Sequence, residues 1–152
     1  MQTMEEEVKE LLLLAAENWE DTAKSTEYMQ LALAKAEDNL DVLVGAYRYF
    51  FYKSNGEMAL KIADKVIDKV KKIENLPDTW EELEPLLMSR KNDEQIRLYL
   101  NAYASIGYLL AKMGNTEDAK IITERVKAID TNRESCATTV FEVLTAPPED
   151  DD

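Results

Sequence analysis

Residues 99–132 read YLNAYASIGYLLAKMGNTEDAKIITERVKAIDTN, and this stretch decides the fold of the chain. In its first half, apolar residues recur at steps of three and four, which indicates an amphipathic helix. Gly114 can end that helix, and Asn115 or Thr116 can cap the next one. A second apolar face begins at Ala119. The stretch therefore predicts two helices that pack their apolar faces together as a hairpin.

This pattern resembles a tetratricopeptide repeat, a helical hairpin of about 34 residues that stacks on its neighbours into a superhelix. The matching positions are the early aromatic Tyr103, the small crossing residue Gly107, the turn residue Gly114, and Ala119 and Asp130 of the second helix. The chain departs from the family at Val126, which replaces a second small residue, and at Thr131, which replaces a proline. The resemblance implies a right-handed superhelical stack of antiparallel helical hairpins. It is nearly silent on function, because the matched positions are packing positions.

We expect three hairpins, at about residues 3–38, 40–73 and 94–131. Asn55 and Gly56 mark the turn of the second hairpin. Ala59 matches Ala119 sixty residues later, a distance of one repeat plus an insertion of about 26 residues. The register of this second hairpin is open by about a residue, because an ungapped alignment places bulky Tyr47 at the small position.

The insertion is expected at about residues 74–93, where Trp80 begins a short extra helix. It acts either as a structural plug or as a device that shapes a groove. A capping helix at about residues 132–145 would cover the last hairpin. Residues 147–152 are expected to form a disordered acidic tail. The prediction is one domain over residues 1–146.

Composition supports an all-α protein and limits its partners. The chain of 152 residues has only four glycines and four prolines, and no segment alternates as a strand does. Its net charge of −13 would repel nucleic acid and anionic membranes. The single cysteine, Cys136, excludes an intramolecular disulfide and favours a reducing compartment. No segment is long and apolar enough to span a bilayer, so we expect a cytoplasmic protein.

The residues needed for common catalytic chemistry are missing from the sequence. There is no histidine, which removes the commonest general base and most zinc sites. No glycine-rich phosphate loop or nucleophile elbow is present. Carboxylates alone could in principle hold a hard cation or act as acid and base. We nevertheless predict no enzymatic activity, no catalytic residues, no cofactor and no metal.

The resemblance places a partner on the first helix of each hairpin. Aromatic anchors with a few hydrogen-bonding groups are typical of a recognition surface. The positions that the resemblance assigns to it are Asp41, Val44, Arg48, Phe51, Tyr52, Asn101, Ser105, Tyr108 and Lys112. Alternatively, Phe51 and Tyr52 complete the core.

The sequence thus favours a non-enzymatic adaptor or scaffold that binds a peptide or partner helix of another protein in a concave groove. A small acidic secretion chaperone is the first alternative, because such chaperones resemble this chain in size, charge and repeat type. A small-molecule sensor or carboxylate-based enzyme is the second. A homodimer through Leu13 and Leu14 and a closed monomer are both compatible with the pattern.

Overall fold

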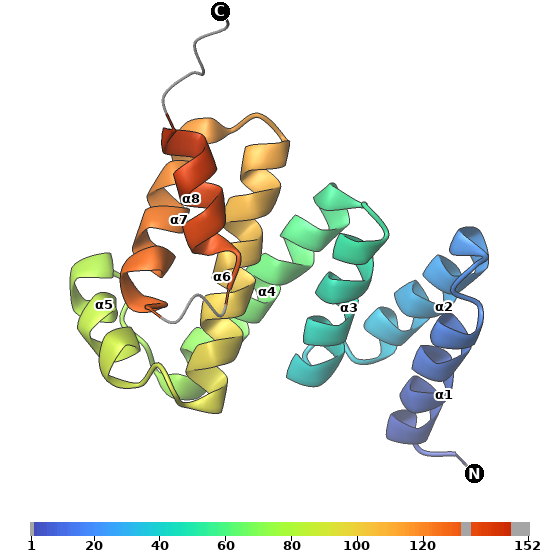
Figure 1. Ribbon diagram of the computed structural model, residues 1–152. Helices are drawn as coiled ribbons and strands as arrows, with labels where there is room; N and C mark the ends of the chain where they lie inside the picture. Colours follow the sequence, from blue (N-terminus) through green and yellow to red (C-terminus); the bar gives the residue numbers. More distant parts are fainter. Residues whose placement is uncertain (1, 132–134, 147–152) are drawn as a thin grey trace, which may run out of the picture. The chain divides into compact units, whose positions relative to one another are not determined.

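The computed structural model describes residues 2–131 and 135–146 (Figure 1). These residues form eight helices and no strand, which confirms the all-α prediction. None of the described helices has the length and apolar character needed to cross a membrane. The helices are α1 (Met4–Glu17), α2 (Thr22–Lys35), α3 (Leu40–Tyr52), α4 (Gly56–Glu74), α5 (Trp80–Ser89), α6 (Glu94–Lys112), α7 (Thr116–Ile129) and α8 (Ala137–Thr145).

The helices occur where the sequence pattern places them. The expected insertion contains α5, and the expected capping helix is α8, which begins at Ala137. The expected start of that helix at residue 132 and the acidic tail at 147–152 lie outside the described residues. The chain forms two compact units, Met1–Ile62 and Ala63–Asp152. The single domain expected for residues 1–146 stays a prediction.

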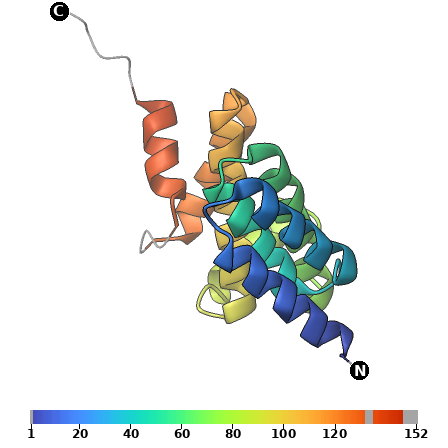
Figure 2. The same cartoon turned by 90° about the vertical axis from the view of Figure 1, so that its right-hand side faces the viewer.

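In the first unit, α1 and α2 lie side by side and antiparallel in both views (Figures 1 and 2). A capping box formed by Thr3 and Glu6 starts α1. Val8, Ala32 and Val42 are buried together and join α1, α2 and α3. Deeper in the unit, the Tyr49 hydroxyl lies 2.5 Å from Ser25 Oγ and 3.0 Å from Thr26 Oγ1, so the polar end of this buried ring is satisfied.

In the second unit, α6 and α7 pack closely because Gly107 faces α7 without a side chain. A Cβ at this position would lie 2.7 Å from Thr123 Cγ2 and 3.2 Å from Ile122 Cγ2. The insertion helix α5 contacts α7, and its Leu83 and Leu87 are buried. Arg125 of α7 lies 4.8 Å from the ring centroid of Trp80 and donates a hydrogen bond to the Tyr103 hydroxyl. These contacts favour the plug interpretation of the insertion.

The turns after α3 and α6 share one backbone geometry. Asn55 N donates to Phe50 O at 2.9 Å, and sixty residues later Asn115 N donates to Leu110 O at 2.9 Å. The residue before each asparagine is left-handed, with φ of 60° at Ser54 and 86° at Gly114. This is the Schellman motif. The turn predicted at Asn55 and Gly56 therefore includes Asn55 but not Gly56, which is the first residue of α4.

The matching turns also fix the register of the second hairpin. Ala59 N bonds to Asn55 O at 3.0 Å, as Ala119 N bonds to Asn115 O at 3.1 Å. Both alanines are completely buried. The ungapped spacing of sixty residues is therefore the local register, and buried Tyr47 stands at the position that corresponds to Gly107.

The left-handed residues give a first test, since a side chain costs about 1 kcal/mol in this conformation. Ser54→Gly should raise the free energy of unfolding by a few tenths to about 1 kcal/mol, and Gly114→Ala should lower it by about 1 kcal/mol. A Cβ at residue 114 meets no atom within 4 Å, so the expected loss of stability comes from backbone strain and not from a steric clash. Urea unfolding measures both changes. Stabilisation by Gly114→Ala would contradict the turn geometry.

The helix crossing at Gly107 gives a second test. Gly107→Ala gains about 1 kcal/mol of helix propensity but overpacks the crossing at a cost of about 1–3 kcal/mol. We expect net destabilisation of about 1 kcal/mol in urea unfolding, because Thr123 is β-branched and its hydroxyl bonds Ala119 O at 2.7 Å.

Two further variants control this result. Thr123→Ser removes the methyl group that would clash and should relieve part of the cost of Gly107→Ala. Gly45→Ala introduces the same change where a Cβ meets nothing within 4 Å, and it should stabilise the protein. If Gly107→Ala and Gly45→Ala stabilised the protein equally, the missing side chain at residue 107 would not be the reason that α6 and α7 pack closely.

Candidate functional site

The first unit contains a groove between α1 and the segment that joins α2 to α3. Its volume is about 640 Å³. Met4, Val8 and Leu12 of α1 line it, and their spacing of four residues places them on one face of that helix. We call this feature the N-terminal groove. Its other lining residues are Glu5, Lys9, Ala34, Lys35, Ala36, Glu37, Asp38, Asn39, Asp41 and Val42.

Local hydrogen bonds hold the walls of the N-terminal groove. Asn39 caps α3, because its Oδ1 accepts from Val42 N at 3.2 Å. Asn39 N donates in turn to Ala36 O at 3.0 Å, which closes the α2–α3 connection tightly. Lys35 Nζ lies 3.1 Å from Glu7 Oε2 and links the end of α2 to α1. The groove is thus shaped by short-range bonds at helix ends.

The charges on the N-terminal groove are unequal. Lys9 pairs with Glu5 at 3.7 Å, and Lys35 pairs with Glu7. Among the described residues, no lysine or arginine forms a salt bridge with Glu37, Asp38 or Asp41. One rim of the groove therefore carries negative charge that the fold does not neutralise.

The structure places the predicted partner residues of α3 in three environments. Asp41 lines the N-terminal groove. Val44 is only 8% exposed, which leaves almost none of its side chain for a partner. Arg48 is exposed and lies 6.0 Å from the Tyr47 ring centroid. Tyr52 is 72% exposed and touches the half-buried ring of Phe51 edge-on.

The predicted residues of α6 form one face of that helix. Ser105 Oγ donates to Asn101 O at 3.0 Å, and Lys112 Nζ lies 5.6 Å from the Tyr108 ring centroid. All but the exposed Lys112 are half-buried. The predicted set thus comprises one face on α3 in the first unit and one on α6 in the second. The concave groove expected to combine them stays a prediction, as does a homodimer through Leu13, which is 58% exposed.

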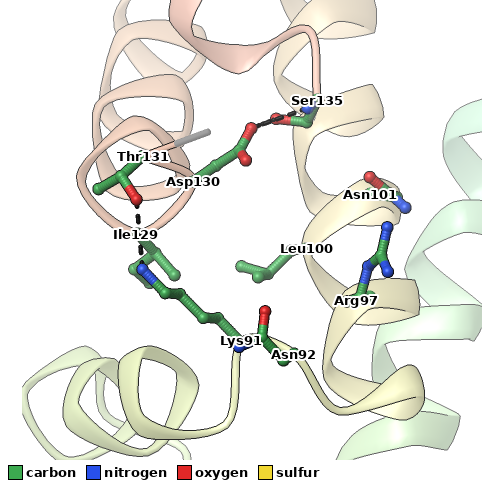
Figure 3. Close-up of a pocket in the computed structure, with 9 residues that line it drawn as sticks. All are labelled: Lys91, Asn92, Arg97, Leu100, Asn101, Ile129, Asp130, Thr131 and Ser135. Carbon is green, nitrogen blue, oxygen red and sulfur yellow. Dashed lines mark hydrogen bonds between the residues drawn. The ribbon is translucent and has the colours of Figure 1, made fainter. Parts of the chain in front are cut away.

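A small polar pocket lies where α6, the end of α7 and the start of the α8 segment meet in the second unit (Figure 3). Lys91 Nζ donates to Thr131 Oγ1 at 3.2 Å, and Asp130 Oδ2 accepts from both N and Oγ of Ser135 at 2.7 Å. Asn101 also lines the pocket. Its volume of about 30 Å³ suits one water molecule rather than a substrate. This pocket is a structural junction.

The described residues contain no group of three or more His, Cys, Asp or Glu side chains placed to hold a metal ion. Desolvation raises the pKa of the Cys136 thiol, although the residue reaches the surface. Its sulfur faces Ala104 O at 3.7 Å. Burial likewise raises the pKa of Tyr99. Both shifts disfavour the anionic form, which is the nucleophilic form of a thiol.

The sequence pattern did not reveal the N-terminal groove. Apolar periodicity alone predicts that Val8 and Leu12 pack inward; in the structure Val8 is buried and Leu12 half-buried, and both border the groove. The apolar stripe on α1 is wide because Leu11, Leu12, Leu13 and Leu14 are consecutive, but only Leu12 of these four lines the groove, so the width of the stripe did not locate it. Periodicity within one helix does not show which apolar residues its neighbours cover.

Comparison with known proteins gives a single relative of similar sequence and no family. An uncharacterized 19.8 kDa protein in the nifW 5' region of Azotobacter chroococcum mcd 1 is 33% identical over 116 residues, which cover 74% of this chain. The chain spans 65% of the length of that relative. No family model matches the chain. No solved structure matches it either.

The polar junction gives a third test. Asp130→Ala removes the acceptor for both Ser135 donors, and hydrogen bonds to charged groups contribute about 1.5–3 kcal/mol. We expect amide hydrogen exchange in Ala137–Thr145 to accelerate about tenfold or more. Glu124→Ala, which removes an exposed carboxylate of α7, is the control. Unchanged exchange in Asp130→Ala would show that the junction does not secure α8.

Proposed function

We propose that this chain is a non-enzymatic adaptor that binds a segment of another protein, on a scaffold of stacked hairpins like that of tetratricopeptide repeats. The observation that carries the proposal is Tyr52. This large aromatic side chain is 72% exposed on the last turn of a folded helix. Exposed aromatic residues beside an arginine are typical anchors of protein interfaces, and Arg48 lies one turn before Tyr52.

The repeated hairpin geometry supports the scaffold part of the proposal. Two turns sixty residues apart share the same hydrogen bonds, and each is followed by a buried alanine, Ala59 or Ala119. Repeat proteins use such conserved packing to present variable residues on their surfaces. Asp41, Arg48 and Tyr52 on α3, and Tyr108 and Lys112 on α6, would be those variable residues here.

Affinity capture tests the proposal. The purified protein should retain a specific protein from the lysate of its native cells, and Tyr52→Ala should weaken that interaction by about 2 kcal/mol, or roughly thirtyfold in affinity, as loss of an aromatic hot spot does. Tyr108→Ala and Arg48→Glu should also weaken it. Titration of the identified partner by calorimetry gives the affinities.

Val143→Ala is a matched control, because Val143 is 70% exposed on α8 and outside the proposed surface. This variant should keep the partner. If wild type, Tyr52→Ala and Tyr108→Ala bound the captured protein with equal affinity, neither the face on α3 nor the face on α6 would belong to the interface. Failure of the wild type to retain any protein would contradict the adaptor function itself.

A further inference from the structure

The N-terminal groove gives the chemistry of a partner. We infer that it binds a basic amphipathic helix of another protein, with the apolar side of that helix against α1 and its lysines or arginines against the rim. The inference rests on the proposed adaptor function and adds a second surface to it, because Tyr52 does not line this groove.

The floor of the N-terminal groove matches the apolar side of a helix. Met4, Val8 and Leu12 follow α1 over two turns; Met4 is 61% exposed and Leu12 is half-buried, whereas Val8 is buried, so Met4 and Leu12 supply the accessible apolar surface. On the other wall Ala34 is exposed and Ala36 half-buried, whereas Val42 is buried. An elongated apolar strip of this kind fits a ridge of side chains spaced three and four residues apart, which is how amphipathic helices dock in grooves.

The rim of the N-terminal groove selects the charge of the partner. Glu37, Asp38 and Asp41 lie close together in sequence beside the apolar strip, and no cation among the described residues pairs with them. The two lysines of the lining are both paired with glutamates of α1. A basic helix would find acceptors here, whereas an acidic helix would be repelled. The net charge of −13 adds long-range attraction for the same partner.

The size of the N-terminal groove also suits this occupant. Helix α1 has 14 residues, which corresponds to a length of about 20 Å. The floor runs from Met4 to Leu12, so a helix laid along α1 can place about two turns on it.

Two synthetic peptides of 14 residues, the length of α1, provide the probe. Both carry leucines at steps of three and four, and their polar faces consist of lysine in one and glutamate in the other. We expect the lysine peptide to bind the full chain and the glutamate peptide to bind at least tenfold more weakly. Amide shifts in nuclear magnetic resonance spectra should move at the groove residues of α1 and of the α2–α3 connection.

Matched variants separate the N-terminal groove from general attraction between opposite charges. Neutralising the rim by Glu37→Gln, Asp38→Asn and Asp41→Asn should weaken binding of the lysine peptide about tenfold. Neutralising three exposed carboxylates outside the groove, by Glu17→Gln, Glu20→Gln and Glu27→Gln, should change it less than threefold. Equal losses from the two triple variants would overturn the inference, since binding would then follow net charge alone.

A steric pair completes the test. Ala34→Arg introduces a long cationic side chain at an exposed residue of the lining and should abolish binding. Ala16→Arg makes the same change at an exposed residue of α1 outside the groove and should preserve it. Circular dichroism checks that each variant is folded. Binding that survives Ala34→Arg would overturn the inference.

Failure of this inference is distinguishable from failure of the adaptor function. If the lysine peptide binds but is lost only in Tyr52→Ala, the N-terminal groove is excluded and the adaptor function stands. If neither peptide binds, and Tyr52→Ala weakens binding of a partner captured from cells, the N-terminal groove is again excluded and the adaptor function stands. If the lysine peptide binds in the groove and no cellular partner is captured, the groove chemistry stands without the α3 surface.

Discussion

The hairpin turn that begins with a left-handed residue is the constraint on which the rest of the structure depends. At Ser54 and at Gly114 the chain reverses within a few residues. The asparagine that follows directly precedes the first residue of the next helix. Because the turn is so short, the two helices are forced to pack from their first residues onward. The residue four positions after each of these asparagines is small, and Ala59 and Ala119 are both fully buried. A buried alanine thus accompanies this turn geometry in both places.

The sequence predicted those parts of the fold that depend on residues with one dominant conformational preference. Gly114 was recognised as a helix end because glycine adopts positive φ readily. Ser54 was not, since serine has no such preference, and the turn was assigned instead to Asn55 and Gly56, of which Gly56 begins α4. Helix periodicity located the apolar faces correctly but could not tell which part of a face stays uncovered. For that reason the N-terminal groove appeared only in the structure.

The candidate site was predictable to a smaller extent. The resemblance placed Arg48, Tyr52 and Val44 on a partner surface; Arg48 and Tyr52 are exposed, whereas Val44 is buried. Burial of a β-branched residue at a predicted surface position depends on how neighbouring helices pack, and periodicity within one helix does not contain that information.

Several cations of this acidic chain are used for the fold. Arg90 binds both Glu74 and Asp93, and its hydrogen bond, with one from the backbone of Gln95, holds the pKa of Asp93 below its ordinary value. Lys53 bonds the carbonyl of Trp19 and lies over its ring. Arg90 thus neutralises carboxylates beside it, whereas Lys53 is held by an uncharged carbonyl and an aromatic ring. The net charge of −13 follows from composition.

The contacts of Lys53 and Arg125 have a spectroscopic consequence. The chain has two tryptophans, Trp19 in the first unit and Trp80 in the second. Each ring has a cation near its face, with Lys53 Nζ 3.9 Å from one centroid and Arg125 Cζ 4.8 Å from the other. Each unit therefore contains its own intrinsic fluorophore, whose emission depends on a tertiary contact. A chain reduced to one tryptophan would report the melting of one unit independently of the other.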